Sequence, residues 1–192
     1  QKVTFREDGS VLLNMRYSFP ERMKGELGHV AKLIHGWQEA AETDRPGVHP
    51  LLSPEATKAY LEDHGLSNIS YRKYSKRNRL YIEISAHASD RKTAVRSGCL
   101  GEMRLDETEE GLRVVLLLPS APDFSMSPKE REHLTRIADG FSLKLSLAGP
   151  GDVRGTNGRR VDDDTVVWEF GTAHLTGESV FPTTLSATFR YR

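Results

Sequence analysis

The sequence predicts an α+β fold: a mainly antiparallel, curved β-sheet with one long and two short helices packed on one face. Three observations indicate this class. Many segments alternate apolar and polar residues with the period of two that a half-buried strand requires. Tight turn sequences such as Asp8-Gly9 join neighbouring strands as hairpins. Strands outnumber helices, and the segments with helical spacing occur singly between hairpins, which favours α+β.

In the first half of the chain, strand pairs flank two helices. Pro20 ends the second strand and is followed by apolar residues three and four apart, which predict an amphipathic helix. Ser53-Pro54-Glu55 reads as an N-cap, a first-turn proline and a first-turn acid, and so begins a shorter helix. The expected elements are strands at 2–6 and 11–19, the long helix at 23–41, a short helix at 53–65, and strands at 66–74 and 80–87.

The second half is richer in strands. The run from Val114 to Leu118 has no polar residue, which predicts a central strand covered on both faces. Ser127-Pro128 opens a capping box and begins the second short helix. Asn157-Gly158 is suited to the positive φ angles of a hairpin turn. The expected elements are a polar segment at 89–98 that is irregular or forms one helical turn, strands at 100–106 and 112–118, a helix at 127–140, and strands at 141–147, 166–170 and 185–191.

Length and composition bound the possible classes of protein. The 192 residues suffice for one domain with a sizeable core or two very small ones, and we expect residues 1–192 to form a single domain. The 27 Lys and Arg residues balance 27 Asp and Glu residues, so net charge gives no general attraction to nucleic acid or membranes. No apolar run approaches the roughly 20 residues of a membrane span. Cys99 is the sole cysteine, so no internal disulfide can form.

Two stretches of the chain resemble LppM-like bacterial lipoprotein domains. Lys2 to Phe19 is similar to the opening hairpin of that family, and GPGDVRGTNGRRVDDDTVVWEF is similar to its closing segment. The resemblance implies a secreted, often lipid-anchored α+β domain with lipid-binding character, and it supplies no catalytic residues. The chain opens directly on a strand at Gln1 without a methionine. We therefore expect an extracytoplasmic domain, membrane-anchored in its full-length precursor, whose signal and anchor are absent from this sequence.

No local catalytic motif is found, so neither an enzyme activity nor a cofactor or metal is predicted. The seven histidines are scattered, and His29 and His35 do not have the spacing of HExxH. Asp162-Asp163-Asp164 lacks the alternate spacing of a calcium loop and is interpreted as a solvated acidic turn. Cys99 has no base assigned by the sequence and is interpreted as a buried small residue. An enzyme whose site is assembled from distant residues, such as His87, Cys99 or the acidic turn Asp162 to Asp164, is a third hypothesis.

The strongest charge feature is YRKYSKRNR at 71–79, in which five cations cluster around a hairpin with Tyr71, Tyr74 and Tyr81 interleaved. Such a cluster suits anionic lipid headgroups or nucleic acid. For an extracytoplasmic domain lipid is favoured, and no nucleic-acid partner is predicted. The alternative is a solvated hairpin tip whose cations protect an edge strand. The candidate headgroup-binding residues are Arg72, Lys73, Lys76, Arg77 and Arg79.

The apolar faces of the sheet and the long helix are a second candidate site. A curved sheet closed by an amphipathic helix can hold an acyl chain. A filled core is the alternative, and the residues alone favour it; the family resemblance is what places lipid binding first. The candidate cavity residues are Leu27, Val30, Ile34 and Trp37 on the helix, with Ile82, Ile84, Leu116 and Leu145 on strands.

Together these features predict a non-catalytic, lipoprotein-like domain of the cell envelope that binds a lipid or other amphiphile. An anionic membrane surface and an envelope protein are the further partners considered. The alternative is a structural or protein-interaction module of the envelope, with a filled core and no small ligand.

Overall fold

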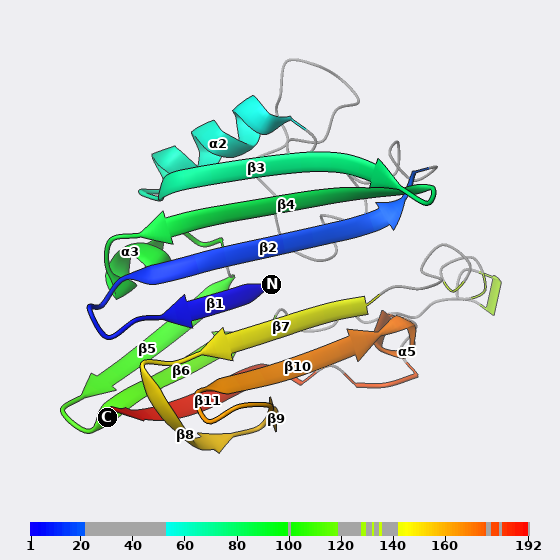
Figure 1. Cartoon of the computed structure of the whole chain (residues 1–192). Coiled ribbons are helices and arrows are strands. Elements are labelled where there is room, and N and C mark those ends of the chain that lie inside the picture. Colours follow the sequence, from blue (N-terminus) through cyan, green and yellow to red (C-terminus); the bar gives the residue numbers. More distant parts are fainter. Residues whose placement is uncertain are drawn as a thin grey trace. The chain divides into compact units, whose positions relative to one another are not determined.

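A computed structural model describes residues 1–21, 53–99, 101–118, 128–129, 132, 135, 142–175, 178–180 and 182–191. The chain divides into two compact units (Figure 1). The N-terminal unit comprises Lys2–Met103, and the C-terminal unit comprises Gln1 with Arg104–Arg192. No helix within these described ranges is long and apolar enough to cross a membrane.

The N-terminal unit is built on four antiparallel strands in the order β3-β4-β2-β1 (Figure 1). β1 (Lys2–Phe5) and β2 (Val11–Pro20) form the predicted opening hairpin, with Gly9 in its turn at a φ of 85°. β4 (Arg79–Ala88) pairs with all ten residues of β2 and also with β3 (Ser67–Lys76). The β3–β4 turn consists of Arg77 and Asn78, both with positive φ, as in a type I′ turn.

The two faces of these strands differ in composition. Successive residues of a strand point to opposite faces, so the alternating pattern separates apolar from polar side chains. One face supplies most of the core of this unit, and the other carries exposed or half-buried polar groups. The buried residues of β2 and β4 are Val11, Leu13, Met15, Leu80, Ile82, Ile84, Ala86 and Ala88.

The described residues of this unit also form two helices, and both begin at a side-chain cap. α2 (Pro54–Asp63) packs along β3 and buries Thr57 and Leu61. Its predicted N-cap, Ser53, accepts a hydrogen bond from the backbone N–H of Ala56 over 3.2 Å. α3 (Arg91–Arg96) is capped by Asp90. The polar segment at 89–98 is thus a helix of six residues, which agrees with the helical alternative.

The C-terminal unit contains two separate sets of paired strands. One is a sheet in the order β5-β6-β11-β8, and the other joins β7, β10 and β9. α5 (Thr172–Leu175) follows β10. The strands are β5 (Glu102–Thr108, which begins before the unit boundary), β6 (Gly111–Leu117), β7 (Ser142–Ala148), β8 (Gly151–Thr156), β9 (Arg159–Arg160), β10 (Thr165–Gly171) and β11 (Thr184–Tyr191).

The mostly β architecture and the mainly antiparallel pairing agree with the predicted fold class. The prediction of a single sheet is wrong, because the C-terminal unit alone contains two separate sets of paired strands. The described helices α2, α3 and α5 have ten, six and four residues. The predicted long helix at 23–41 lies outside the described residues, as does most of the helix predicted at 127–140. The strand predicted to be covered on both faces is buried on one: Val114 is buried and Val115 is half-buried.

The prediction of a hairpin at Asn157-Gly158 is also wrong. β8 pairs with β11, whereas β9 pairs with β10, so these two residues carry the chain from one sheet to the other. Gly158 is not among the positive-φ residues of the described chain. Glycine is required here for space, because a Cβ atom on Gly158 would lie 2.5 Å from Cε2 of Trp168.

Candidate functional site

The polar face of three neighbouring strands in the N-terminal unit carries a group of arginines and tyrosines. Strand register places Arg16, Glu83 and Arg72 in one row across β2, β4 and β3. The next row contains Ser18, Tyr81 and Tyr74, and the row at the hairpin end contains Pro20, Arg79 and Lys76. We call the following eight residues the arginine–tyrosine surface: Arg16, Ser18, Arg72, Tyr74, Lys76, Arg79, Tyr81 and Glu83.

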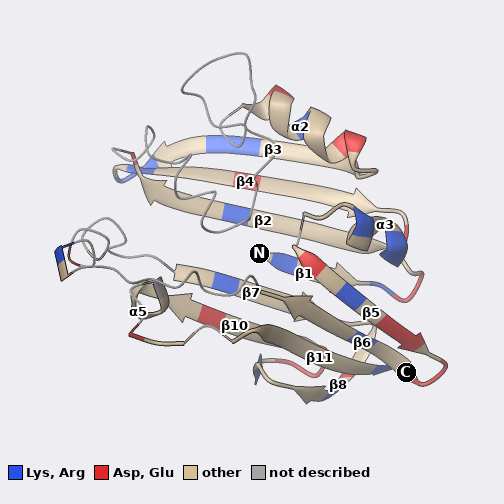
Figure 2. Ribbon diagram, turned by 180° about the vertical axis from the view of Figure 1, so that it is seen from behind, with Lys and Arg blue, Asp and Glu red and all other residues tan. Residues whose placement is uncertain are grey.

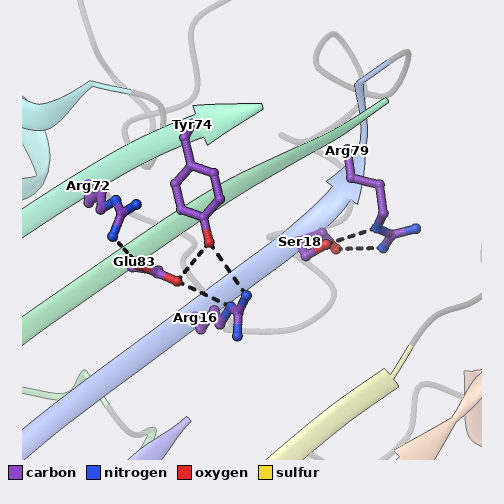
Figure 3. Close-up of polar contacts among 6 residues, drawn as sticks. All are labelled: Arg16, Ser18, Arg72, Tyr74, Arg79 and Glu83. Carbon is purple, nitrogen blue, oxygen red and sulfur yellow. Dashed lines mark hydrogen bonds and ion pairs between the residues drawn. The ribbon is translucent and has the colours of Figure 1, made fainter. Parts of the chain in front are cut away.

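Glu83 is the centre of the polar contacts on this surface (Figure 3). Its Oε1 lies 3.3 Å from Nε of Arg16, and its Oε2 lies 3.9 Å from Nη1 of Arg72. The Tyr74 hydroxyl donates to Oε1 over 2.9 Å. The side chains of Arg16 and Arg72 are 64% and 73% exposed, so water screens both ion pairs and each contributes little to stability.

Two stacked tyrosines lie beside this carboxylate. The rings of Tyr74 and Tyr81 face each other across the strand pair with centroids 5.0 Å apart and planes 7° from parallel. The Cζ atom of Arg72 lies 4.7 Å from the Tyr74 centroid, and that of Arg16 lies 5.4 Å from the Tyr81 centroid. These cation–π contacts hold the two guanidinium groups against the rings while most of each side chain stays exposed to solvent.

The structure brings three of the five predicted headgroup-binding residues onto this surface. Arg72 and Lys76 lie on β3, and Arg79 on β4 donates from Nε and Nη2 to the hydroxyl and carbonyl oxygens of Ser18, over 2.9 and 3.1 Å. Arg77 is exposed in the turn. Lys73 follows Arg72 directly along β3 and therefore belongs to the opposite face.

Tyr71 belongs to that opposite face too, and not to the arginine–tyrosine surface. Burial, and to a lesser extent the Glu55 carboxylate of α2, raises the pKa of Tyr71 to about 12. Both effects disfavour the phenolate. Of the three tyrosines interleaved with the cations in the sequence, only Tyr74 and Tyr81 therefore share a face with the arginines.

Arg16, Ser18 and Glu83 were missed as site residues by the sequence reasoning. Arg16 lies 56 positions before Arg72 in the chain, and the two meet only because β2 and β3 both pair with β4. The available signal was the alternation of β2 and β4, which already placed Arg16 and Glu83 opposite the apolar face. Figure 2 shows the outcome, with blue bands on β2 and β3 on either side of a red band on β4.

The structure describes four of the eight candidate cavity residues. Leu27, Val30, Ile34 and Trp37 lie outside the described residues. Ile82 and Ile84 are buried in the N-terminal unit. In the C-terminal unit, Leu116 is buried and Leu145 is half-buried. The cavity stays a prediction.

The residues considered for catalysis or metal binding have local structural contacts. Cys99 is 3% exposed, and burial raises the pKa of its thiol, which reduces the reactive thiolate. Asp163 forms an ion pair with Arg160 over 2.7 Å. His87 is half-buried on β4, in the other unit from the acidic turn. Among the described residues there is no cluster of three or more His, Cys, Asp or Glu side chains placed to hold a metal ion.

Comparisons with known proteins give one structural similarity. No family model matches the chain, and no curated protein sequence matches it. The structure is similar to the NMR structure of the folded domain of LppM from Mycobacterium tuberculosis, with a TM-score of 0.49 and 16% sequence identity. The match covers 99% of this chain and 86% of that chain, which carries the name of the family that the motifs at 2–19 and 149–170 resemble.

Proposed function

We propose that this chain is a non-catalytic domain of the bacterial cell envelope that binds anionic lipid headgroups through the arginine–tyrosine surface. One observation carries the proposal: four cationic side chains and two stacked tyrosines share one face of β2, β4 and β3. Glu83 is the single carboxylate among the eight residues. The envelope location and a membrane anchor in the precursor belong to the same proposal, and the motif resemblance at 2–19 and 149–170 supports them.

The chemistry of the surface fits a phosphate-bearing headgroup. A guanidinium group presents several N–H donors in a plane and can donate two parallel hydrogen bonds to phosphate oxygens. Cations close to an anionic membrane contribute about 1 kcal/mol each to binding. Tyrosine suits the membrane–water interface because its ring is apolar and its hydroxyl is polar. Exposed arginines that already lie against tyrosine rings therefore combine the two properties that lipid-surface binding requires.

Vesicle co-sedimentation tests the proposal. The chain is expected to sediment with phosphatidylglycerol vesicles and to remain in solution with phosphatidylcholine vesicles. Because the attraction is electrostatic, binding should weaken as salt is added. Arg72→Gln combined with Arg79→Gln removes two cations of the surface and should weaken binding about tenfold or more.

The matched control removes two cations elsewhere. Arg113 on β6 and Arg154 on β8 are exposed and lie in the C-terminal unit. Arg113→Gln combined with Arg154→Gln changes net charge equally and should leave binding near the wild-type level. Equal losses in the two double variants, or no sedimentation of the wild type with anionic vesicles, would count against the proposal.

A protein-interaction role is the second candidate, and the position of β3 favours it. Among the described strands, β3 stands at one edge of its sheet, and an edge strand can pair with a strand of another protein. The shift in register between Ser67 and Ser70 and the cations of β3 oppose uncontrolled pairing. A photo-crosslinker at Lys76 that captures one envelope protein in intact cells, with no vesicle binding by the purified chain, would favour this role.

A further inference from the structure

We infer that Glu83 is a specificity-determining residue of the arginine–tyrosine surface: an internal anion that competes with lipid headgroups for Arg16 and Arg72. The inference rests on the proposed function. Under it, Glu83 sets the fraction of anionic lipid that a membrane needs before the surface binds to it. No motif drew attention to Glu83, since it becomes central only when three strands are aligned.

The position of the carboxylate carries the inference. Glu83 lies on the middle strand of the three, directly opposite Arg16 on one side and Arg72 on the other. Each of its oxygens faces a different guanidinium group, over 3.3 and 3.9 Å. A headgroup phosphate that contacted both arginines would compete with Glu83 for them, because carboxylate and phosphate oxygens accept from the same guanidinium N–H groups.

The charges of Arg16, Glu83 and Arg72 explain why the surface would select densely charged membranes. Two guanidinium groups and one carboxylate leave a single positive charge in the row, so an isolated monoanion gains little by approaching it. A membrane rich in anionic lipid offers many negative charges at once and can outcompete one partly exposed carboxylate. Glu83 thus restricts binding to densely charged surfaces, whereas the same surface without its charge would bind weakly charged membranes as well.

The contacts also show that the charge of Glu83 can be removed with little structural change. The Tyr74 hydroxyl donates to Oε1 of Glu83 over 2.9 Å, and a glutamine at this position retains an oxygen that can accept that bond. The ion pairs themselves are exposed and contribute little to stability. Glu83→Gln therefore frees both arginines while retaining the stacked tyrosines.

The C-terminal unit contains a matched control. Glu169 on β10 also lies between two cations on a strand surface, with Lys144 Nζ at 3.0 Å and Arg159 Nη2 at 3.5 Å from its Oε1. Glu169→Gln adds the same net positive charge as Glu83→Gln. A difference in membrane binding between the two variants therefore reports the location of the charge and not its amount.

The test is binding to vesicles with an increasing mole fraction of phosphatidylglycerol in phosphatidylcholine, at constant ionic strength. Glu83→Gln is expected to reach half-maximal binding at a lower fraction of anionic lipid and to bind about fivefold more tightly at a given composition. Glu169→Gln is expected to follow the wild type. Circular dichroism of each variant checks that the fold is retained.

The outcomes separate this inference from the proposed function. If the wild type binds anionic vesicles but Glu83→Gln binds no more tightly, the role of Glu83 is overturned and the proposed function stands. If both glutamine variants gain equally, net charge alone acts and the role of Glu83 is again overturned. If only Glu83→Gln binds, the role of Glu83 is supported and the proposed function of the native surface fails. If no variant binds, both fail.

Discussion

The indole Nε1 of Trp168 donates a hydrogen bond to Oδ1 of Asn157 over 3.0 Å. The same oxygen accepts from the backbone N–H of Ser186 over 2.9 Å, and Nδ2 of Asn157 donates to the carbonyl of Thr184 over 2.8 Å. One asparagine side chain thus connects β10 with β11 at the point where the chain passes from β8 to β9. Trp168 is 6% exposed, so its N–H depends on this partner.

Asn157→Ala is expected to destabilise the chain by about 2 kcal/mol, because the buried indole N–H of Trp168 loses its acceptor. Urea unfolding followed by tryptophan fluorescence measures this. Asn157→Asp is the control: it keeps the oxygen that accepts from Trp168 and Ser186, and it replaces the donor to Thr184 with a charged oxygen. Asn157→Asp is expected to lose less stability than Asn157→Ala. The reverse order would show that the acceptor for the Trp168 indole is not what matters.

Gly158→Ala is expected to destabilise the chain by about 1–3 kcal/mol through overpacking. Its new Cβ would lie 2.5 Å from Cε2 of Trp168 and 2.7 Å from Cγ1 of Val166. Gly155→Ala is the control, since a Cβ there meets nothing within 4 Å and Gly155 is not among the described residues with positive φ. Thermal unfolding should show a lower Tm for the first variant and little change for the second. Equal Tm values would show that the ring can move away.

Local sequence signals predicted most of the described strands and the ends of α2. The apolar and polar alternation of β2 and β4 held over ten residues each, and Ser53 caps α2 as expected. The junction at Asn157-Gly158 could not be predicted in this way. Turn preferences describe a residue's own backbone, whereas Gly158 is required because of the Trp168 ring, which lies on β10.

The candidate site was predictable to the extent that its cations are neighbours in the sequence. Arg72 and Arg79 belong to one charged hairpin, and the period of two already separates Arg72 from Lys73. Arg16 and Glu83 could not be joined to them, because strand register between distant segments determines which residues share a row. The central role of a carboxylate within a cationic cluster was therefore visible only in the structure.

Ionisation of Tyr71 is expected to lower the free energy of unfolding at alkaline pH. Its folded-state pKa is raised from 10.0 to about 12 by burial and, secondarily, by Glu55. The folded state therefore holds the phenolic proton more tightly than the unfolded state. This stabilisation is fully present below pH 10 and is lost as the pH rises through the window between the two values. The free energy of unfolding, measured at several pH values, should decline less steeply with rising pH for Tyr71→Phe than for the wild type. Parallel declines would show that Tyr71 is not the group responsible.

Protonation of Asp90 is expected to destabilise α3 at acidic pH. The pKa of its carboxyl is lowered, first by the hydrogen bond from the backbone N–H of Thr93 and then by those from the hydroxyls of Thr93 and Ser89. The folded-state pKa lies below the unfolded value, so the stabilisation is present at neutral pH and is lost as the pH falls through the folded-state pKa.

Asp90→Ala removes this N-cap and should lower the Tm at pH 7, with a difference from the wild type that shrinks progressively in acid. Asp90→Asn separates capping from titration, because an amide oxygen still accepts from the Thr93 N–H but carries no proton equilibrium. Its Tm should lie between the other two at pH 7. A Tm difference between Asp90→Ala and the wild type that is unchanged down to acidic pH would show that the ionised carboxylate is not what stabilises the first turn of α3.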